Sequence, residues 1–158
     1  MTRAVELWVG VPRWLRMLLP VAAMATLWWL SSREPEPRPE STARALFYNS
    51  MHVVAYGCLA GSVWLAWTRA QVASHHAFRS RGAWLIATLY GVVDELHQSY
   101  VPGRVCSAAD LASDAIGAAL AVVLLRGISG VAPKSGSVAG ILFVVAILSI
   151  GAATFAGW

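Results

Sequence analysis

Charged residues are scarce in this chain. Asp, Glu, Lys and Arg make up 13% of its 158 residues, whereas about a quarter of a soluble domain is charged. Hydrophobic residues reach 58%, eight residues are tryptophan, and the mean hydropathy is +0.60. So few charges exclude an ordinary soluble globular domain and place the chain in the membrane class.

The chain also lacks the cysteine and aromatic patterns of several other classes. Its two cysteines, Cys58 in an apolar run and Cys106 in a loop, fit neither a zinc site nor a disulfide framework. The net charge of +4 comes from arginines at the ends of apolar segments. Aromatic residues do not alternate with basic ones as on a nucleic-acid stacking surface, so we expect no nucleic-acid partner.

Five apolar stretches remain after these exclusions. A bilayer core about 30 Å thick is crossed by about 20 apolar residues in a helix. The stretches that approach this length are 15–32, 50–68, 82–99, 108–126 and 138–157. Their connections are short and contain no repeat. The sequence therefore predicts one all-α domain over 1–158, a polytopic transmembrane helical bundle of about five membrane helices.

The first stretch has two interpretations. Arg13 and Arg16 precede an apolar run, and Ala23-Met24-Ala25 resembles the small-residue cleavage site of a signal peptide. The apolar run continues past that site to Trp28 and Trp29, which is typical of an aromatic belt at a membrane interface. The second pattern favours a retained membrane helix.

Two features lie between the first and second stretches. Residues 32–40 contain three prolines and alternating charge, which predicts a water-exposed loop without regular helix. Residues 41–48 can form a short interfacial helix capped by Ser41.

The distribution of Lys and Arg predicts the orientation. Cytoplasmic segments carry an excess of these residues. With the N-terminus inside, eight of the twelve fall on the inner side and four on the outer side. The eight are Arg3, Arg13, Arg16, Arg69, Arg79, Arg81, Arg126 and Lys134, and the four are Arg33, Arg38, Arg44 and Arg104. The count favours an N-in, C-out topology.

In this topology the polar residues of the second to fourth stretches gather in one outer layer. A charge in the bilayer core costs about 3 kcal/mol, so such residues point to a functional site. The layer contains His52, Asp94, Glu95, His97, Gln98, Asp110 and Asp114, with Arg104 in the adjoining loop. Asp94, His97 and Gln98 have the spacing i, i+3 and i+4 and so share one helix face.

Small residues favour close packing below this layer. Asp110, Asp114, Gly117 and Ala121 form one helical stripe, acidic above and small below, which allows a neighbouring helix to approach. His52 and Tyr56 form a matching stripe on the second stretch, with Gly57 and Gly61 beside it. Pro102-Gly103 predicts a turn with a positive φ at Gly103, which folds Arg104 back over the helix ends.

Structural explanations remain open for several of these residues. Ser107-x-x-Asp110 matches a capping box, so Asp110 can serve only to start a helix. His52 can be an interfacial side chain near a helix start. Arg104 can bind a lipid headgroup, or form a structural ion pair with one of the acids Asp94, Glu95 and Asp114.

The motif YGVVDELHQSYVPGR, followed by D-L-x2-D-x2-G, resembles the signature of VanZ-like membrane proteins. That family is named after a glycopeptide (teicoplanin) resistance determinant. The resemblance covers 49–121 and includes His52 and Tyr56 upstream of the motif. It implies a small protein of four or five spans in a bacterial inner (cell) membrane, with no established reaction.

The chain departs from the family pattern at three places. Asn49-Ser50 stands where the family commonly has an acid or lysine before the histidine, and Ala121 replaces a glycine. Asp114 stands where the family commonly has asparagine, which adds a charge and favours a bound cation or a shared proton.

The polar layer leads to a first hypothesis about function. The protein acts on or binds a lipid-linked or cell-envelope headgroup, with a link to glycopeptide resistance implied by the resemblance. Carboxylates and imidazole are general acids and bases and also ligands for a divalent cation. The candidate catalytic residues are Glu95, Asp94, His97 and His52, and the candidate substrate-binding residues are Arg104, Gln98, Tyr56, Asp114 and Asp110.

Two other hypotheses use the same residues. A non-catalytic protein would bind or occlude a glycopeptide or envelope precursor, and whether a reaction occurs stays open between this hypothesis and the first. An ion-coupled transporter is less favoured, because the inner halves of the second to fourth stretches are apolar. Membrane lipids are the expected partners in every case.

Overall fold

The computed structural model describes residues 3–35, 41–68, 76–129 and 135–155. Within these ranges every regular element is an α-helix, which confirms the all-α fold class. The helices are α1 (Arg3–Gly10), α2 (Arg13–Ser31), α3 (Thr42–Ala66), α4 (His76–Gln98), α5 (Ala108–Ile128) and α6 (Ser135–Phe155).

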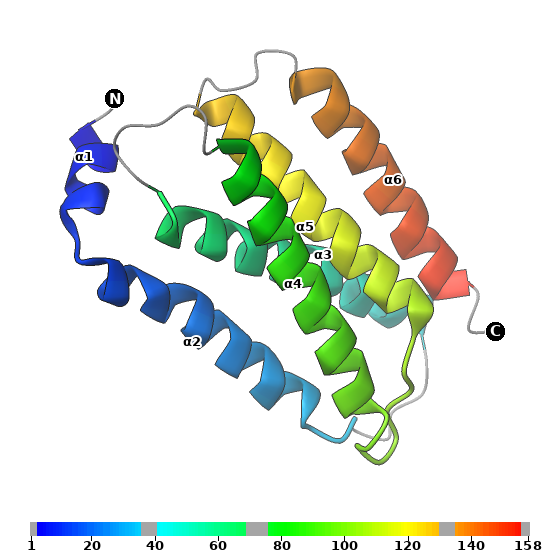
Figure 1. Ribbon diagram of the computed structural model, residues 1–158. Helices are drawn as coiled ribbons and strands as arrows, with labels where there is room; N and C mark the ends of the chain where they lie inside the picture. Colours follow the sequence, from blue (N-terminus) through cyan, green and yellow to red (C-terminus); the bar gives the residue numbers. More distant parts are fainter. Residues whose placement is uncertain (1–2, 36–40, 69–75, 130–134, 156–158) are drawn as a thin grey trace.

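Helices α3, α4 and α5 form the centre of the bundle (Figure 1). Helix α2 packs on α3 and α4, and α6 packs on α5 and α3 from the opposite side. In the described part of the chain α2 and α6 make no contact with each other. The Tyr90 hydroxyl on α4 donates to the Met24 carbonyl oxygen on α2 at 2.6 Å, which links these two helices.

Two helices differ from the sequence-based prediction. Ser41 caps a helix as predicted, because its hydroxyl accepts from the Arg44 amide at 3.3 Å. The prediction of a short separate helix over 41–48 is wrong, since α3 continues without interruption from Thr42 to Ala66. No glycine or proline occurs between Thr42 and Tyr56, so nothing in this segment ends the helix. Helix α1 was not predicted, and part of the loop over 32–40 lies outside the described residues.

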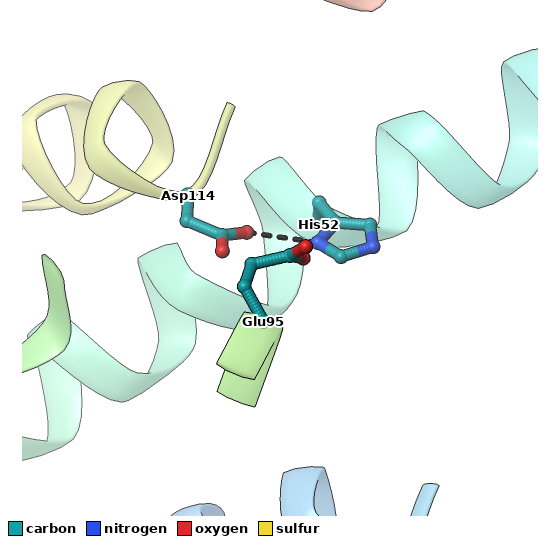
Figure 2. Close-up of side chains that lie close together, drawn as sticks. All are labelled: His52, Glu95 and Asp114. Atoms are coloured by element: carbon teal, nitrogen blue, oxygen red, sulfur yellow. Dashed lines mark hydrogen bonds and ion pairs between the residues drawn. The ribbon is translucent and has the colours of Figure 1, made fainter. Parts of the chain in front are cut away.

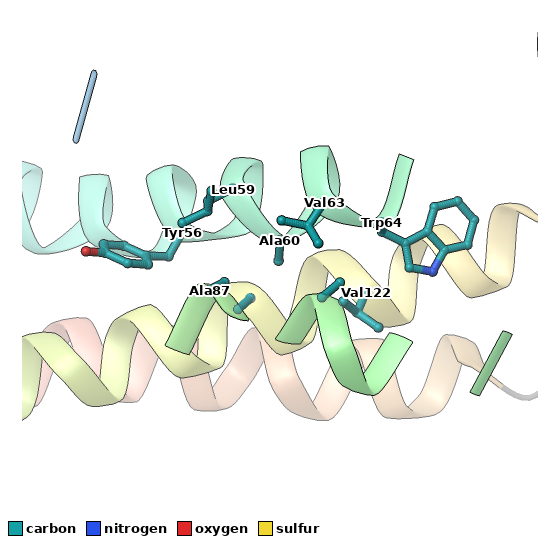
Figure 3. Packing of buried hydrophobic residues seen from close by; sticks show 9 residues of the cluster. Tyr56, Leu59, Ala60, Val63, Trp64, Ala87 and Val122 are labelled. Atoms are coloured by element: carbon teal, nitrogen blue, oxygen red, sulfur yellow. The ribbon is translucent and has the colours of Figure 1, made fainter. Parts of the chain in front are cut away.

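Small residues bring α3 and α5 together. A Cβ added to Gly117 would lie only 2.8 Å from the Cα of Val53, and one added to Gly57 would lie 3.2 Å from the carbonyl oxygen of Gly117. The two backbones are therefore in direct contact, as the small-residue stripe predicts. The packed core continues along α3 with Tyr56, Leu59, Ala60, Val63 and Trp64, facing Ala87 and Val122 (Figure 3).

The outer surface carries many exposed apolar side chains. Large hydrophobic residues of α2, α4 and α6, such as Leu18, Leu89 and Ile147, are half or more exposed. Soluble monomers rarely expose so much contiguous apolar surface, so this pattern is typical of a membrane protein. By length and composition, α2 and α5 can cross a bilayer. Helix α6 has a shorter apolar stretch, Gly136–Ala152.

Candidate functional site

Three helices bring His52, Glu95 and Asp114 together at the end of the bundle where α4 and α5 are connected (Figure 2). His52 comes from α3, Glu95 from α4 and Asp114 from α5. One nitrogen or oxygen atom of each side chain lies within 4.8 Å of those of the other two. We call these three residues the His–carboxylate cluster.

Asp114 is the innermost member of the cluster. It is fully buried, and its Oδ1 pairs with His52 Nδ1 at 2.9 Å. Its Oδ2 has no hydrogen-bond partner. Gly91 leaves room for this oxygen, because a Cβ there would lie 3.0 Å from Oδ2. The carboxylate is thus held on one side by imidazole and is free on the other.

Glu95 is held in a similar way by the start of α5. The Ser107 amide donates to Glu95 Oε2 at 2.6 Å, while Oε1 is buried without a partner. Ser107 also caps α5, since its hydroxyl accepts from the Asp110 amide at 3.2 Å. The cap at Ser107 follows from the sequence, but the contact with Glu95 does not, because a backbone amide leaves no signal in the sequence.

Asp94, Gln98 and Tyr56 lie beside the cluster. Gln98 Nε2 donates to Asp94 Oδ2 at 3.1 Å, as expected for residues i and i+4 on one helix face. Asp94 and the Tyr56 hydroxyl are buried beside each other. Tyr56 packs parallel to the His52 ring, with 6.4 Å between ring centroids.

Two carboxylate oxygens at this end of the bundle, Glu95 Oε1 and Asp114 Oδ2, are therefore buried without a hydrogen-bond partner. Buried polar groups are normally hydrogen-bonded, so such a concentration is unusual. His52 is the most exposed member of the cluster, with 21% of its side chain accessible. The half-buried imidazole thus connects the buried acids to the surface.

His97 is placed outside this group. Its ring stacks on Trp28 of α2 with 3.8 Å between centroids, and its Nε2 is 2.9 Å from the Ser32 hydroxyl. Asp94 and Gln98 point to the interior, whereas His97, one turn from Asp94, faces α2. The structure thus brings His52, Glu95, Asp94, Gln98, Tyr56 and Asp114 together, but not His97.

Arg104 also contacts α2. Its Nε donates to the Arg33 carbonyl and its Nη2 to the Leu30 carbonyl, both at 3.2 Å. These carbonyls lie at the C-terminal end of α2, where a cation is favourable. Gly103 precedes it with φ = 76°, so the predicted positive-φ turn is confirmed. Among the described residues Arg104 forms no ion pair with the buried acids.

Asp110 occupies the first turn of α5 and is half-buried. Its amide completes the Ser107 cap, so the capping interpretation of this residue is correct in part. Its carboxylate does not belong to the His–carboxylate cluster.

The chemistry of the site follows from its ionisable side chains. Two buried carboxylates and an imidazole can exchange protons with a bound molecule, or they can ligate a cation through their free lone pairs. Neither activity requires a side chain outside the three central helices.

The fold and the site together define an all-helical protein of membrane character with a buried His–carboxylate cluster. The family model described as VanZ/LLP1 matches residues 8–129, which include α2 to α5 and every residue of the site. The chain belongs to this family, as the resemblance in its motif indicates. No curated protein and no solved structure matches the chain.

Proposed function

We propose that the protein spans the membrane several times and uses the site around His52, Glu95 and Asp114 to bind, or act on, the headgroup of a lipid-linked or other cell-envelope compound. The observation that carries this proposal is the pair of buried, unpartnered carboxylate oxygens of Glu95 and Asp114 at one end of a bundle whose outer surface is apolar. Polar groups at such depth are costly and persist where a ligand uses them.

The proposed topology places this end of the bundle outside the cell. It comprises the five spans α2 to α6, with the N-terminus inside. The excess of Lys and Arg on the opposite side supports this orientation. A headgroup in the outer leaflet would then reach the site through His52, its most accessible residue.

Lipid analysis of whole membranes tests the proposal. Membranes from cells with the wild type or Glu95→Gln are compared by mass spectrometry at equal protein levels. The substitution keeps the volume of Glu95 but removes its charge. A lipid or envelope precursor whose amount or structure changes only with the wild type is the expected result.

Glu34→Gln is the matched control for this experiment. Glu34 is exposed at the same end of the molecule, so the same chemical change occurs outside the site. Equal lipid profiles for the wild type and Glu95→Gln would contradict an action on lipids.

A non-catalytic role in binding a glycopeptide is the second candidate. It is favoured by the charge of the site, because Asp94, Glu95 and Asp114 form no ion pair with a described Arg or Lys. A group of buried acids without a basic partner from Arg or Lys favours a cationic ligand, such as the amines of a glycopeptide. A binding protein would protect cells in proportion to its copy number and leave every lipid unchanged, whereas an enzyme would release a changed product.

A further inference from the structure

The His–carboxylate cluster contains carboxylate oxygens that point to a positively charged ligand. Glu95 is 3% exposed and Asp114 is fully buried, yet Glu95 Oε1 and Asp114 Oδ2 lack partners. A buried charge without a partner costs far more folding free energy than a buried charge that is paired. Figure 2 shows Asp114 Oδ1 joined to the His52 ring and the Glu95 carboxylate beside the same ring, so the three side chains meet at one place.

The distances suit a single cation. Ligand atoms bound about 2.1 Å from one metal ion lie about 3.0–3.4 Å apart in octahedral or tetrahedral geometry. His52 Nδ1 and Asp114 Oδ1 are 2.9 Å apart in their hydrogen bond, close to this value, so a cation would take the place of the shared proton. The three ligand atoms all lie within 4.8 Å of one another, and binding of a cation would draw them to this spacing.

We infer that His52, Glu95 and Asp114 bind one divalent transition-metal cation of the Zn²⁺ or Mn²⁺ class. The imidazole nitrogen selects against Mg²⁺ and Ca²⁺, which prefer ligand sets made only of oxygen. Three protein ligands leave at least one coordination position for a water molecule or a ligand oxygen, as in catalytic zinc sites.

The cation would also explain how an acidic site accepts an anionic headgroup. A phosphate is repelled by Asp94, Glu95 and Asp114 unless positive charge is added between them. A divalent cation supplies that charge and offers its open position to a phosphate oxygen. This second step rests on the proposed function, whereas binding of the cation alone does not.

Residues around the cluster support its geometry. The Ser107 amide fixes Glu95 Oε2 and leaves Oε1 directed inward. Gly91 keeps the space beside Asp114 Oδ2 open. Such outer contacts orient ligands in metal sites.

The experiment measures metal binding by the purified full chain in detergent micelles. Protein stripped with EDTA is titrated with Zn²⁺ or Mn²⁺ alone, with calorimetry for affinity and elemental analysis for stoichiometry. We expect one cation per chain and at least a tenfold weaker affinity in Glu95→Gln and in Asp114→Asn. Mg²⁺ is expected to bind more weakly than either transition metal.

Two control variants make the result specific. Glu34→Gln removes an exposed carboxylate and is expected to bind as the wild type does. His76→Gln breaks the His75-His76 pair in the sequence, which can bind zinc adventitiously, and is also expected to leave the cluster's affinity unchanged. Equal affinities in all variants, or no stoichiometric binding, would overturn the inference.

A measurement on the wild type alone guards against variants that fail to fold. Electron spin-echo spectroscopy of the Mn²⁺-loaded wild type should show nitrogen coupling from one imidazole, and its absence would also overturn the inference. The lipid comparison separates the two proposals. A bound cation without any lipid change would contradict the action on lipids only, and a lipid change without a cation would contradict this inference only.

Discussion

At the residue scale, His97 and Arg104, two basic side chains that the sequence motif groups with the acids, make contacts that their sequence positions do not reveal. Arg104 and His97 both face α2, one through the carbonyls of Leu30 and Arg33 and the other through Trp28 and Ser32. They connect the α4–α5 loop and the end of α4 to the end of α2. The acids are thereby left with His52 as their basic partner among the described residues.

The substitution Arg104→Ala tests this structural role. It removes two hydrogen bonds from a charged donor to the end of α2, so we expect the free energy of unfolding to fall by about 1–2 kcal/mol. Thermal unfolding in detergent, followed by circular dichroism, measures the change. Arg81→Ala, which removes an exposed arginine at the other end of α4, should have a smaller effect.

Cation binding distinguishes this structural role of Arg104 from direct binding of the ligand. Folded Arg104→Ala protein should bind the cation with wild-type affinity, because Arg104 does not contact the cluster. A variant that keeps full stability but loses binding of the headgroup would instead assign Arg104 to the ligand, as the sequence hypothesis has it.

At the element scale, the distance between α3 and α5 determines whether His52 reaches Asp114. The two helices touch through backbone atoms at Gly117 and Val53, one turn from the His52–Asp114 pair. A side chain at this contact would separate the helices and draw the imidazole away from the carboxylate. Small residues are therefore needed both for packing and for assembling the site.

The substitution Gly117→Ala tests this link. Its Cβ would overlap the Val53 backbone, which cannot move aside as a flexible side chain can. We expect a loss of about 1–3 kcal/mol of stability and weaker cation binding. Gly61→Ala on the same interface is the control, since its Cβ would lie 3.7 Å from a Leu125 methyl group, an ordinary contact. Equal stability of the two variants would contradict close backbone packing.

At the scale of the whole molecule, the orientation in the membrane decides which compounds reach the site. The chain's two cysteines are well placed to measure it. Cys106 is exposed in the segment that precedes α5, next to the site, and Cys58 is exposed on the side of α3, within the proposed span.

A membrane-impermeant maleimide applied to intact cells should label Cys106 and not Cys58. Cys106 faces water outside the cell in the N-in topology, whereas a thiol in hydrocarbon does not ionise and reacts poorly. Cys106→Ser should abolish the signal. Labelling of Cys106 only after permeabilisation would reverse the topology, and equal labelling of Cys58 would contradict the spanning of α3.

Much of this fold follows from the sequence. The all-helical class, the approximate positions of α2 to α6, the cap at Ser41, the turn at Gly103 and the small-residue contact at Gly117 depend on local pattern and residue size. Each of these features depends on residues that lie close together in the chain, so it can be predicted from one sequence. The family follows from the motif in the same way.

The composition of the site was decided by tertiary structure. Helical spacing groups Asp94, His97 and Gln98 on one face, but α4 packs against different neighbours across that face. His97 therefore contacts α2, whereas Asp94 is buried in the interior. The cluster forms where three helices cross, and it joins His52 to Glu95 and Asp114. Its members lie up to 62 residues apart in the chain, so no local pattern specifies their meeting. The sequence thus determines which chemical groups are available at this end of the bundle, and the packing of α3, α4 and α5 selects those that act together.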